Sequence, residues 1–260
     1  MKITYFSSGP RQQLFEALLA SKHDVVRVVT TDPERWPKVG PTLALAKAHG
    51  IPVVKIKHKD ELDRLVPLLE GTVCLSAGFA FLFPASFLTL IEQQHLMLLN
   101  VHGTLLPKYR GGRTLNWVIA HGETESGVTV HQIDTGMDTG PILLQRRFPV
   151  SAFDTGKSLY RKTLAFEPEV VLEALALLEV GKAEFTPQPR LNGHKHPGLE
   201  VPDRQPEHSE LDASQPLCDL YDTIRAADPV DYPAHFFVEG QKVCVKLWRD
   251  DKPADEGDLI

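Results

Sequence analysis

The stretch KITYFSSGPRQQLFEALLASKHDVVRVVTT, residues 2–31, decides the fold class. Its apolar start, residues 2–7, is typical of a buried strand, and the leucines of residues 10–21 recur at helical spacing. The β-branched run at residues 25–30 predicts a second strand. A strand, a helix and a strand in this order predict two parallel strands joined by a crossover helix.

The same alternation continues along the first half of the chain. Helical patterns lie at residues 41–49 and 59–69, and strand patterns lie at residues 51–56, 72–75 and 96–101. This rhythm predicts an α/β fold whose mainly parallel sheet is flanked by helices on both faces. Ligands of such sheets bind beyond the carboxyl ends of the strands. The first turn lacks GxGxxG, but Ser8, Gly9 and Arg11 could hold a phosphate there, or could simply form a strand-to-helix turn.

The second half of the chain changes in character. Strand patterns near Val128 and after Ile142 fit the same sheet, and residues 154–181 predict a long helix that Asp154 or Thr155 could cap. We expect three parts: a main domain at 1–185, a polar linker at 186–216, and a small extension of one helix and a β-hairpin at 217–260.

Composition indicates which partners the protein binds and in which compartment it works. The chain of 260 residues has a net charge of −6, which argues against a surface that grips nucleic acid. Its longest apolar runs fall far short of the roughly 20 residues that cross a bilayer, so we expect no membrane contact. Three cysteines without a CxxC pair indicate reduced thiols and a cytoplasmic protein.

The stretch with the densest chemistry is LNVHGTLLPKYRGGRTLNWVIAHGETESGVTVHQIDTGMDTGPI, residues 99–142. Asn100 and His102 share one strand face, since the side-chain period of a strand is two. An amide can stabilise an oxyanion and an imidazole can move a proton near neutral pH, which suits acyl transfer to an amine. A carboxylate nearby could tune the imidazole, and by spacing alone Asp134 and Asp138 are equally eligible, or either could be a turn residue.

The segments NVHGTLLPKYRGG and GVTVHQIDTGMDTGPIL resemble the folate-dependent formyltransferase family. The resemblance is close over residues 70–150 and extends to most of residues 1–185. It implies a Rossmann-like formyltransferase fold, 10-formyltetrahydrofolate as cosubstrate and no metal. The family aspartate follows the histidine of GVTxH by seven positions, so the resemblance implies Asn100, His102 and Asp138 as catalytic residues.

The resemblance also implies where the folate would bind. The segment SAGFAFLF is similar to the pterin-binding segment of the family. The implied cofactor-binding residues are Phe79, Ala80, Phe81, Phe83, Leu105, Ile133 and Asp134. The family loop contains a cis proline, which matches the Leu106–Pro107 bond here.

The acceptor amine is implied less directly. The runs LPKYRG, LNW and GETESGVT look most like enzymes that formylate nucleotide-linked amino sugars of the 4-amino-4-deoxy or 4-amino-4,6-dideoxy type, for surface polysaccharide synthesis. Because a nucleotide sugar carries two phosphates, the candidate acceptor-binding residues are Ser8, Gly9, Arg11, Lys108, Tyr109, Arg110 and Arg113, and their cations could equally be solvated surface charges. The sequence departs from many relatives at Gly112–Arg113–Thr114, because in those relatives the arginine directly follows the glycine of KYRG.

Other functions stay open at this point. Residues 224–248 resemble the start of the C-terminal β-domain of sugar and tRNA formyltransferases, but only about two strand signals follow. Methionyl-tRNA formyltransferase ranks second, glycinamide ribonucleotide transformylase third, and a non-catalytic folate-binding module is a different class. An HxH pair, His194 and His196, offers a weak metal alternative, and Trp248 could lie in a homodimer face.

Overall fold

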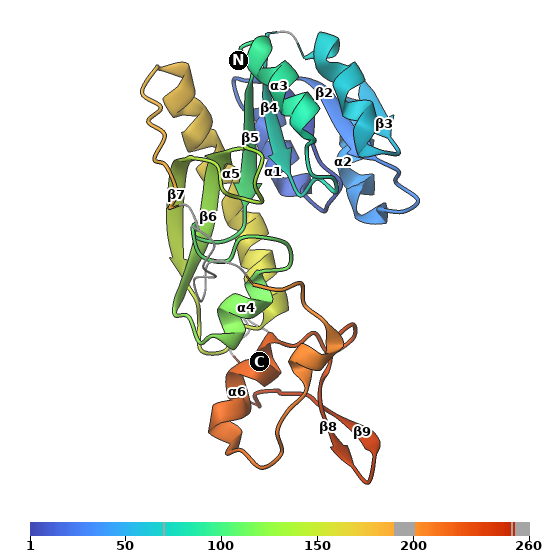
Figure 1. Ribbon diagram of the computed structural model, residues 1–260, viewed down its shortest axis with the longest axis vertical. Helices are drawn as coiled ribbons and strands as arrows, with labels where there is room; N and C mark the ends of the chain where they lie inside the picture. The colour runs from blue at the N-terminus through green and yellow to red at the C-terminus, as the bar shows by residue number, and fades with distance from the viewer. Residues whose placement is uncertain (70, 190–200, 251, 253–260) are drawn as a thin grey trace. The chain divides into compact units, whose positions relative to one another are not determined.

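A computed structural model describes residues 1–69, 71–189, 201–250 and 252 (Figure 1). The strands of the main sheet are β1 Lys2–Phe6, β2 Asp24–Thr31, β3 Val53–Ile56, β4 Thr72–Ala77, β5 Met97–His102, β6 Glu125–Gln132 and β7 Ile142–Pro149. A separate hairpin comprises β8 Ala234–Val238 and β9 Gln241–Val245. The α-helices are α1 Gln12–Ala20, α2 Gly40–Ala48, α3 Ala85–Gln93, α4 Leu115–Ala120, α5 Gly156–Glu179 and α6 Leu217–Ala226, and the short 3-10 helices are η1 Pro37–Val39, η2 Lys59–Leu68 and η3 Pro206–Ser209.

The main sheet has the strand order β3-β2-β1-β4-β5-β6-β7. The pairs from β3 to β5 are parallel, and β6 runs antiparallel to β5. The predicted fold class, a mostly parallel sheet flanked by helices, is therefore confirmed. The carboxyl ends of the parallel strands meet at one edge, which is where β5 ends at His102.

Alternation along β1 explains why both faces of this sheet are covered. Tyr5 and Phe6 are adjacent and fully buried, so they point to opposite faces. Tyr5 stacks on Phe15 of α1, with ring centroids 5.5 Å apart. Phe6 belongs instead to a core cluster with Leu62 of η2 and Phe87 of α3. Burial on both faces is the physical reason that these strands read as continuous apolar runs.

The described chain forms two compact units. Unit 1 contains residues 1–102, 128–146 and 164–190, and unit 2 contains residues 103–127, 147–163 and 191–260. Unit 2 has its own apolar clusters, one around α4 and one between α6 and β8. The three-part division expected from the sequence stays a prediction.

Several element boundaries differ from those expected. The long helix predicted for residues 154–181 is Gly156–Glu179, and the final strand expected to reach Trp248 ends at Val245. Thr155 caps the long helix, since its Oγ1 accepts the Ser158 N–H at 3.2 Å. Residues 59–68 form a 3-10 helix, in which Pro67 removes a backbone donor.

The predicted hairpin turn lies where Gly240 indicated. Glu239 and Gly240 both have positive φ, 50° and 76°, as a tight two-residue hairpin turn requires. Trp248 lies beyond this hairpin and is 75% exposed. The HxH pair falls outside the described residues, and the residues that the structure does describe contain no metal-ligand cluster and no helix long and apolar enough to span a bilayer.

Candidate active site

The register between β5 and β6 brings two of the predicted residues to polar partners. Asn100 pairs directly with His131, and His102 pairs with Thr129. Directly opposed residues of antiparallel strands hold their side chains close together on one face. The Asn100 Nδ2 atom lies 3.2 Å from the His131 Nε2 atom.

Asp138 completes the group from the loop between β6 and β7. Its Oδ1 atom lies 3.3 Å from Asn100 Nδ2, and its Oδ2 atom lies 3.4 Å from His102 Nδ1. The His102 and Asp138 side chains are only 8% and 14% exposed. The structure thus brings together Asn100, His102 and Asp138, the three residues that the sequence singled out.

His131 is a fourth member of the group, and in the sequence it marked only the position from which Asp138 is counted. It is 2% exposed, and its Nε2 atom lies 3.5 Å from Asp138 Oδ1. Its Nδ1 atom lies 2.9 Å from the Gln132 carbonyl oxygen, so Nδ1 carries the proton that it donates there. In the tautomer with the proton on Nδ1, the His131 Nε2 atom is the acceptor for the Asn100 amide. No signal in the sequence indicated this role, because the Asn100–His131 pairing depends on the register of β5 against β6.

The loop geometry decides between the two aspartates that spacing left open. The Asp134 Oδ1 atom accepts the Gly136 N–H at 3.0 Å and the Thr139 hydroxyl at 2.6 Å, which is a local turn. Asp138, with φ of 54°, turns its carboxylate toward Asn100 and His102. Asp134 is accordingly a turn residue by its contacts, and any role in folate binding stays a prediction.

Two features fix the backbone of this loop. A Cβ atom on Gly140 would lie 1.9 Å from the Gln132 carbonyl oxygen, so only glycine fits there. The Gln188 side chain donates to the backbone oxygens of Asp138 and Gly140, at 3.0 and 2.6 Å. Gln188 lies in the stretch expected to be a polar linker, so its role escaped the sequence analysis.

The arrangement can perform proton transfer beside a polarised carbonyl. A carboxylate next to Nδ1 favours the tautomer in which His102 Nε2 accepts a proton. The amide hydrogens of Asn100 point at His131 and Asp138 across 3.2 and 3.3 Å. These contacts are at the long end for hydrogen bonds, so an oxyanion could compete for one of them.

The predicted folate segment lies in unit 1 with the predicted catalytic residues. Phe79 and Phe83 are stacked with ring centroids 5.4 Å apart, and both pack against Phe6. Phe81, which follows β4, and Ile133, which follows β6, pack on the same core cluster. The Ala80 N–H donates to Ser8 Oγ at 3.3 Å, so this backbone donor already has a partner in the protein. Leu105 belongs to unit 2.

The residues of the predicted phosphate turn in unit 1 form hydrogen bonds and an ion pair with neighbouring residues of the same unit. Ser8 is 2% exposed, and its Oγ also accepts the Thr31 hydroxyl at 2.9 Å. The Arg11 guanidinium lies against the Gly9 and Gly78 backbone, and its Nε atom is 2.8 Å from the buried Glu167 carboxylate. Burial raises the pKa of Glu167 to about 7, and Arg11 acts in the opposite direction. Sequence reasoning missed Glu167, which reads as an ordinary helix residue.

The remaining predicted acceptor residues lie in unit 2. Lys108 Nζ is 2.9 Å from Glu123 Oε1, which also accepts the Tyr109 hydroxyl at 2.9 Å. Burial raises the pKa of Tyr109, and its hydrogen bond to Glu123 adds to this. Arg110 is buried, whereas Arg113 is exposed and donates to the Tyr232 hydroxyl at 2.7 Å.

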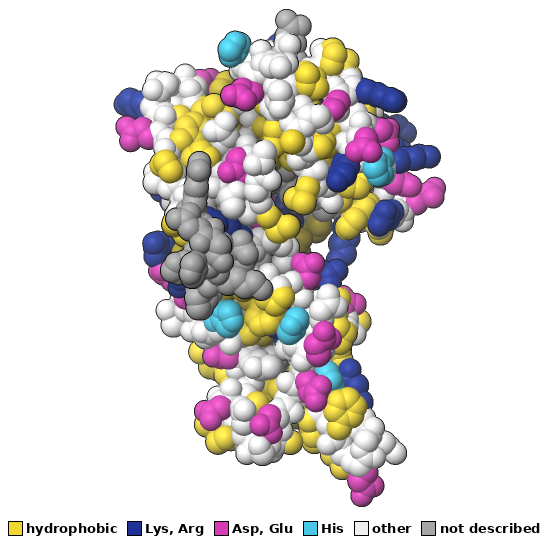
Figure 2. All heavy atoms as spheres, in the orientation of Figure 1, with side chains coloured by type: hydrophobic (Ala, Val, Ile, Leu, Met, Phe, Trp, Pro, Cys, Tyr) yellow, Lys and Arg dark blue, Asp and Glu magenta, His cyan; other side chains and the backbone are white. Residues whose placement is uncertain are grey.

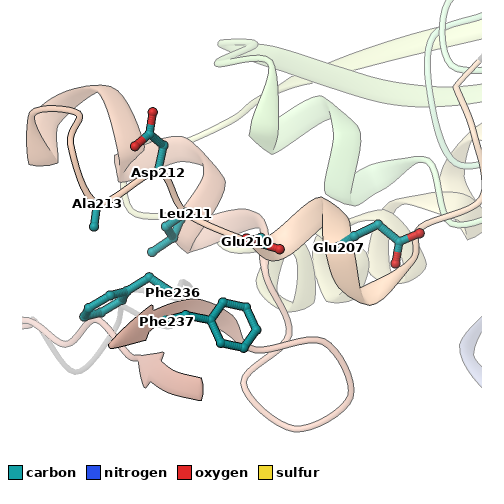
Figure 3. A pocket seen from close by; sticks show the side chains of 7 residues that line it. All are labelled: Glu207, Glu210, Leu211, Asp212, Ala213, Phe236 and Phe237. Atoms are coloured by element: carbon teal, nitrogen blue, oxygen red, sulfur yellow. The ribbon is translucent and has the colours of Figure 1, made fainter. Parts of the chain in front are cut away.

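A hollow of about 560 Å³ lies elsewhere in unit 2 (Figure 3). Acidic and aromatic side chains line it, and none of the predicted site residues is among them. The lining residues are Glu207, Glu210, Leu211, Asp212, Ala213, Phe236 and Phe237. Its carboxylates make it unsuitable for a phosphate, so we do not place the predicted acceptor there.

Comparison with known proteins identifies the family of this chain. The model of the formyl transferase family matches residues 1–175. The chain belongs to the formyl transferase family. A methionyl-tRNA formyltransferase of Synechococcus sp. (strain JA-2-3B'a(2-13)) is 36% identical over 216 residues, which cover 82% of this chain and 63% of that protein. The chain thus spans less than two thirds of that curated relative.

Solved formyltransferase structures share the fold. A 4-N formyltransferase from Francisella tularensis matches with a TM-score of 0.74 and 20% identity, over 96% of this chain and 98% of that chain. WlaRD, a sugar 3N-formyl transferase solved in the presence of dTDP and 5-N-formyl-THF, matches with a TM-score of 0.71 and 22% identity, over 94% of this chain and 84% of that chain. At these identities the likeness establishes the fold.

Proposed function

We propose that this protein transfers a formyl group from 10-formyltetrahydrofolate to the amine of a nucleotide-linked amino sugar. One observation carries the transfer chemistry. In a chain of the formyl transferase family, the Asp138 carboxylate lies within 3.5 Å of polar atoms of Asn100, His102 and His131.

The proposed reaction assigns a task to each of these groups. The amine nitrogen attacks the formyl carbon, the carbonyl electrons move to oxygen, and the bond to N10 of the folate then breaks. Asn100 donates to the developing oxyanion, and His102 Nε2 accepts the amine proton and returns a proton to N10. Asp138 holds His102 in the required tautomer, and His131 orients the Asn100 amide.

The charge of residues 201–250 supports a small acceptor rather than a nucleic acid. Residues 201–250 carry ten Asp and Glu side chains against five Lys and Arg side chains. Figure 2 shows acidic side chains, in magenta, over the surface that α6, β8 and β9 form. Such a surface repels an RNA backbone, whereas a nucleotide sugar needs only a few local cations.

The names of the fold neighbours point the same way. The neighbours described above include a 4-N and a sugar 3N-formyl transferase, and WlaRD was solved with a formylated folate and dTDP. We extend this chemistry to the present chain and place the reaction in the cytoplasm, in the assembly of a surface polysaccharide. The three free cysteines, of which two are exposed, fit a reducing compartment.

Methionyl-tRNA formyltransferase is the second candidate, because a specific observation favours it. The curated relative described above carries that name, and its 36% identity exceeds the 20% and 22% of the fold neighbours. Both candidates share the same catalytic group and donor, so only the acceptor separates them.

A panel of acceptors tests the proposal. The purified chain is incubated with 10-formyltetrahydrofolate and, in separate reactions, UDP-, dTDP- and GDP-linked 4-amino sugars, glycinamide ribonucleotide and methionyl-tRNA. Mass spectrometry then detects the mass of one added formyl group, with Asn100→Ala as the inactive control. We expect a formylated nucleotide sugar. If only the tRNA is formylated, methionyl-tRNA is the acceptor and the nucleotide-sugar proposal is wrong. If folate binds but no acceptor is formylated, the protein is better described as a folate-binding module.

A further inference from the structure

Arg204 is a buried arginine to which the proposed reaction assigns no role. Only 2% of it is exposed, and it lies in the stretch that the sequence presents as a polar linker. Its Nη2 atom donates to Ser209 Oγ at 3.1 Å, and its guanidinium carbon lies 5.2 Å from the centre of the Trp117 ring. Its Nε and Nη1 atoms are buried and have no hydrogen-bond partner among the described residues. Three N–H groups therefore lack an acceptor.

This lack of a counter-charge distinguishes Arg204 from Arg225, another buried arginine of unit 2. The Arg225 Nε atom lies 2.5 Å from Asp222 Oδ1, and its Nη1 atom donates to the backbone oxygens of Ser151 and Asp154. Within the described part of the chain, Arg204 has no carboxylate within 4.0 Å, the distance that defines the ion pairs. A buried cation without a counter-charge is costly, so an anion that enters the site would be bound strongly.

The surroundings of Arg204 belong to the predicted acceptor loop. The Trp117 indole N–H donates to the Pro202 carbonyl oxygen at 2.8 Å, which holds residues 202–204 against α4. The Asp203 carboxylate lies near Gly112 in the LLPKYRGGR loop, 3.8 Å from where a Cβ atom would be. This loop and Arg204 lie in unit 2, whereas the predicted folate residues Phe79–Phe83 lie in unit 1.

A second N–H donor lies at the same indole. The His208 ring meets Trp117 edge to face, with centroids 5.0 Å apart. Its Nδ1 atom accepts the Gln205 N–H at 2.9 Å, so the ring proton resides on Nε2. Guanidinium and imidazole N–H groups around one aromatic face suit a multidentate anion with several acceptor oxygens.

We propose that Arg204 binds the diphosphate of the acceptor nucleotide, and this inference rests on the function proposed above. The unpaired N–H groups of Arg204 would donate to phosphate oxygens, with the guanidinium held on Trp117. The diphosphate would supply the negative charge that no described protein group provides next to Arg204.

Calorimetric titration tests this site without reference to catalysis. The probes are UDP, dTDP, inorganic pyrophosphate and folinic acid, each titrated into the full chain. For Arg204→Gln we expect the Kd of the nucleotide diphosphates and of pyrophosphate to rise at least 10-fold, with the Kd of folinic acid unchanged. The matched control is Arg147→Gln, which removes an exposed arginine of unit 2 that pairs with Glu125, and it should bind all probes as the unaltered chain does.

Several results would overturn the site. They are unaltered pyrophosphate affinity in Arg204→Gln, loss of folinic acid binding in place of diphosphate binding, or no binding of any diphosphate by the unaltered chain. Should Arg204→Gln fail to fold, Arg204→Lys keeps the charge but loses the planar donors, and an intermediate Kd is expected. A chain that formylates no nucleotide sugar but loses pyrophosphate binding in Arg204→Gln would refute the proposed function and keep the anion site.

Discussion

At the scale of single residues, the central question is which carboxylate serves the active site. Spacing left Asp134 and Asp138 equivalent, and family resemblance favoured Asp138. The structure separates them by their contacts, because Asp134 closes a turn on Gly136 and Thr139 while Asp138 lies between Asn100 and His102. The two residues therefore form a matched pair for mutation.

Asp138→Asn should lower kcat about 100- to 1,000-fold, because the neutral amide no longer holds His102 in its proton-accepting tautomer. The KM values should change little, since Asp138 is not assigned a direct contact with either substrate. Asp134→Asn keeps the side-chain oxygen that closes the turn and should change kcat by less than about twofold. Steady-state kinetics of both variants check this. Equal losses in the two variants would contradict the assignment.

At the scale of elements, the strands were largely predictable and the site was partly so. β-branched and apolar runs marked β2 and β4, because strands covered on both faces must be apolar throughout. The Asn100–His131 pairing was not predictable, since it depends on the register of β5 against β6. Gln188 and Arg204 were missed because a polar residue outside a periodic pattern gives no sign of its burial.

The loop that carries Asp138 should be sensitive to a single methyl group. In Gly140→Ala the new Cβ would overlap the Gln132 carbonyl oxygen, so the loop must shift. A displacement of about 1 Å is enough to lower turnover roughly 100-fold, while the rest of the sheet stays folded. Circular dichroism and kinetics together measure this.

Gly40→Ala is the control for that loop variant. Its Cβ would meet no atom within 4 Å, and its backbone is already helical, so stability and turnover should be preserved. A Gly140→Ala variant that matched Gly40→Ala in turnover would show that the loop tolerates displacement.

At the scale of the whole molecule, the buried Glu167 should make stability depend on pH. Its pKa in the folded chain is about 7, above the usual value of 4.5. Between these two values the folded chain keeps a proton that the unfolded chain releases, so stability falls as pH rises through this window. At about 1.36 kcal/mol for each pKa unit, the loss from this group reaches about 3 kcal/mol by neutral pH.

Urea denaturation at pH 5 and pH 8 checks the pH dependence. Glu167→Gln should lose less stability than the unaltered chain between these two values. Glu173→Gln is the matched control, because Glu173 lies on the same helix and pairs with Arg146 at the surface, and it should leave the pH dependence unchanged. If all three proteins show the same dependence, Glu167 does not titrate in this window.

The division of labour between the two units has a functional consequence. Unit 1 holds the proposed catalytic residues and the predicted folate segment, and unit 2 holds Arg204 and the predicted acceptor loop. Substitutions in unit 1 should therefore act on kcat and on folate binding, whereas substitutions at Arg204 should act on acceptor binding.

A competition reaction tests the central claim most directly. The chain is mixed with 10-formyltetrahydrofolate that carries a ¹³C-formyl group, and with a UDP-linked 4-amino sugar, a dTDP-linked 4-amino sugar and methionyl-tRNA together. The account predicts that the label appears on the amine of a nucleotide sugar and that Asn100→Ala abolishes it. Label found on methionyl-tRNA, or released as formate with both sugars untouched, would contradict it.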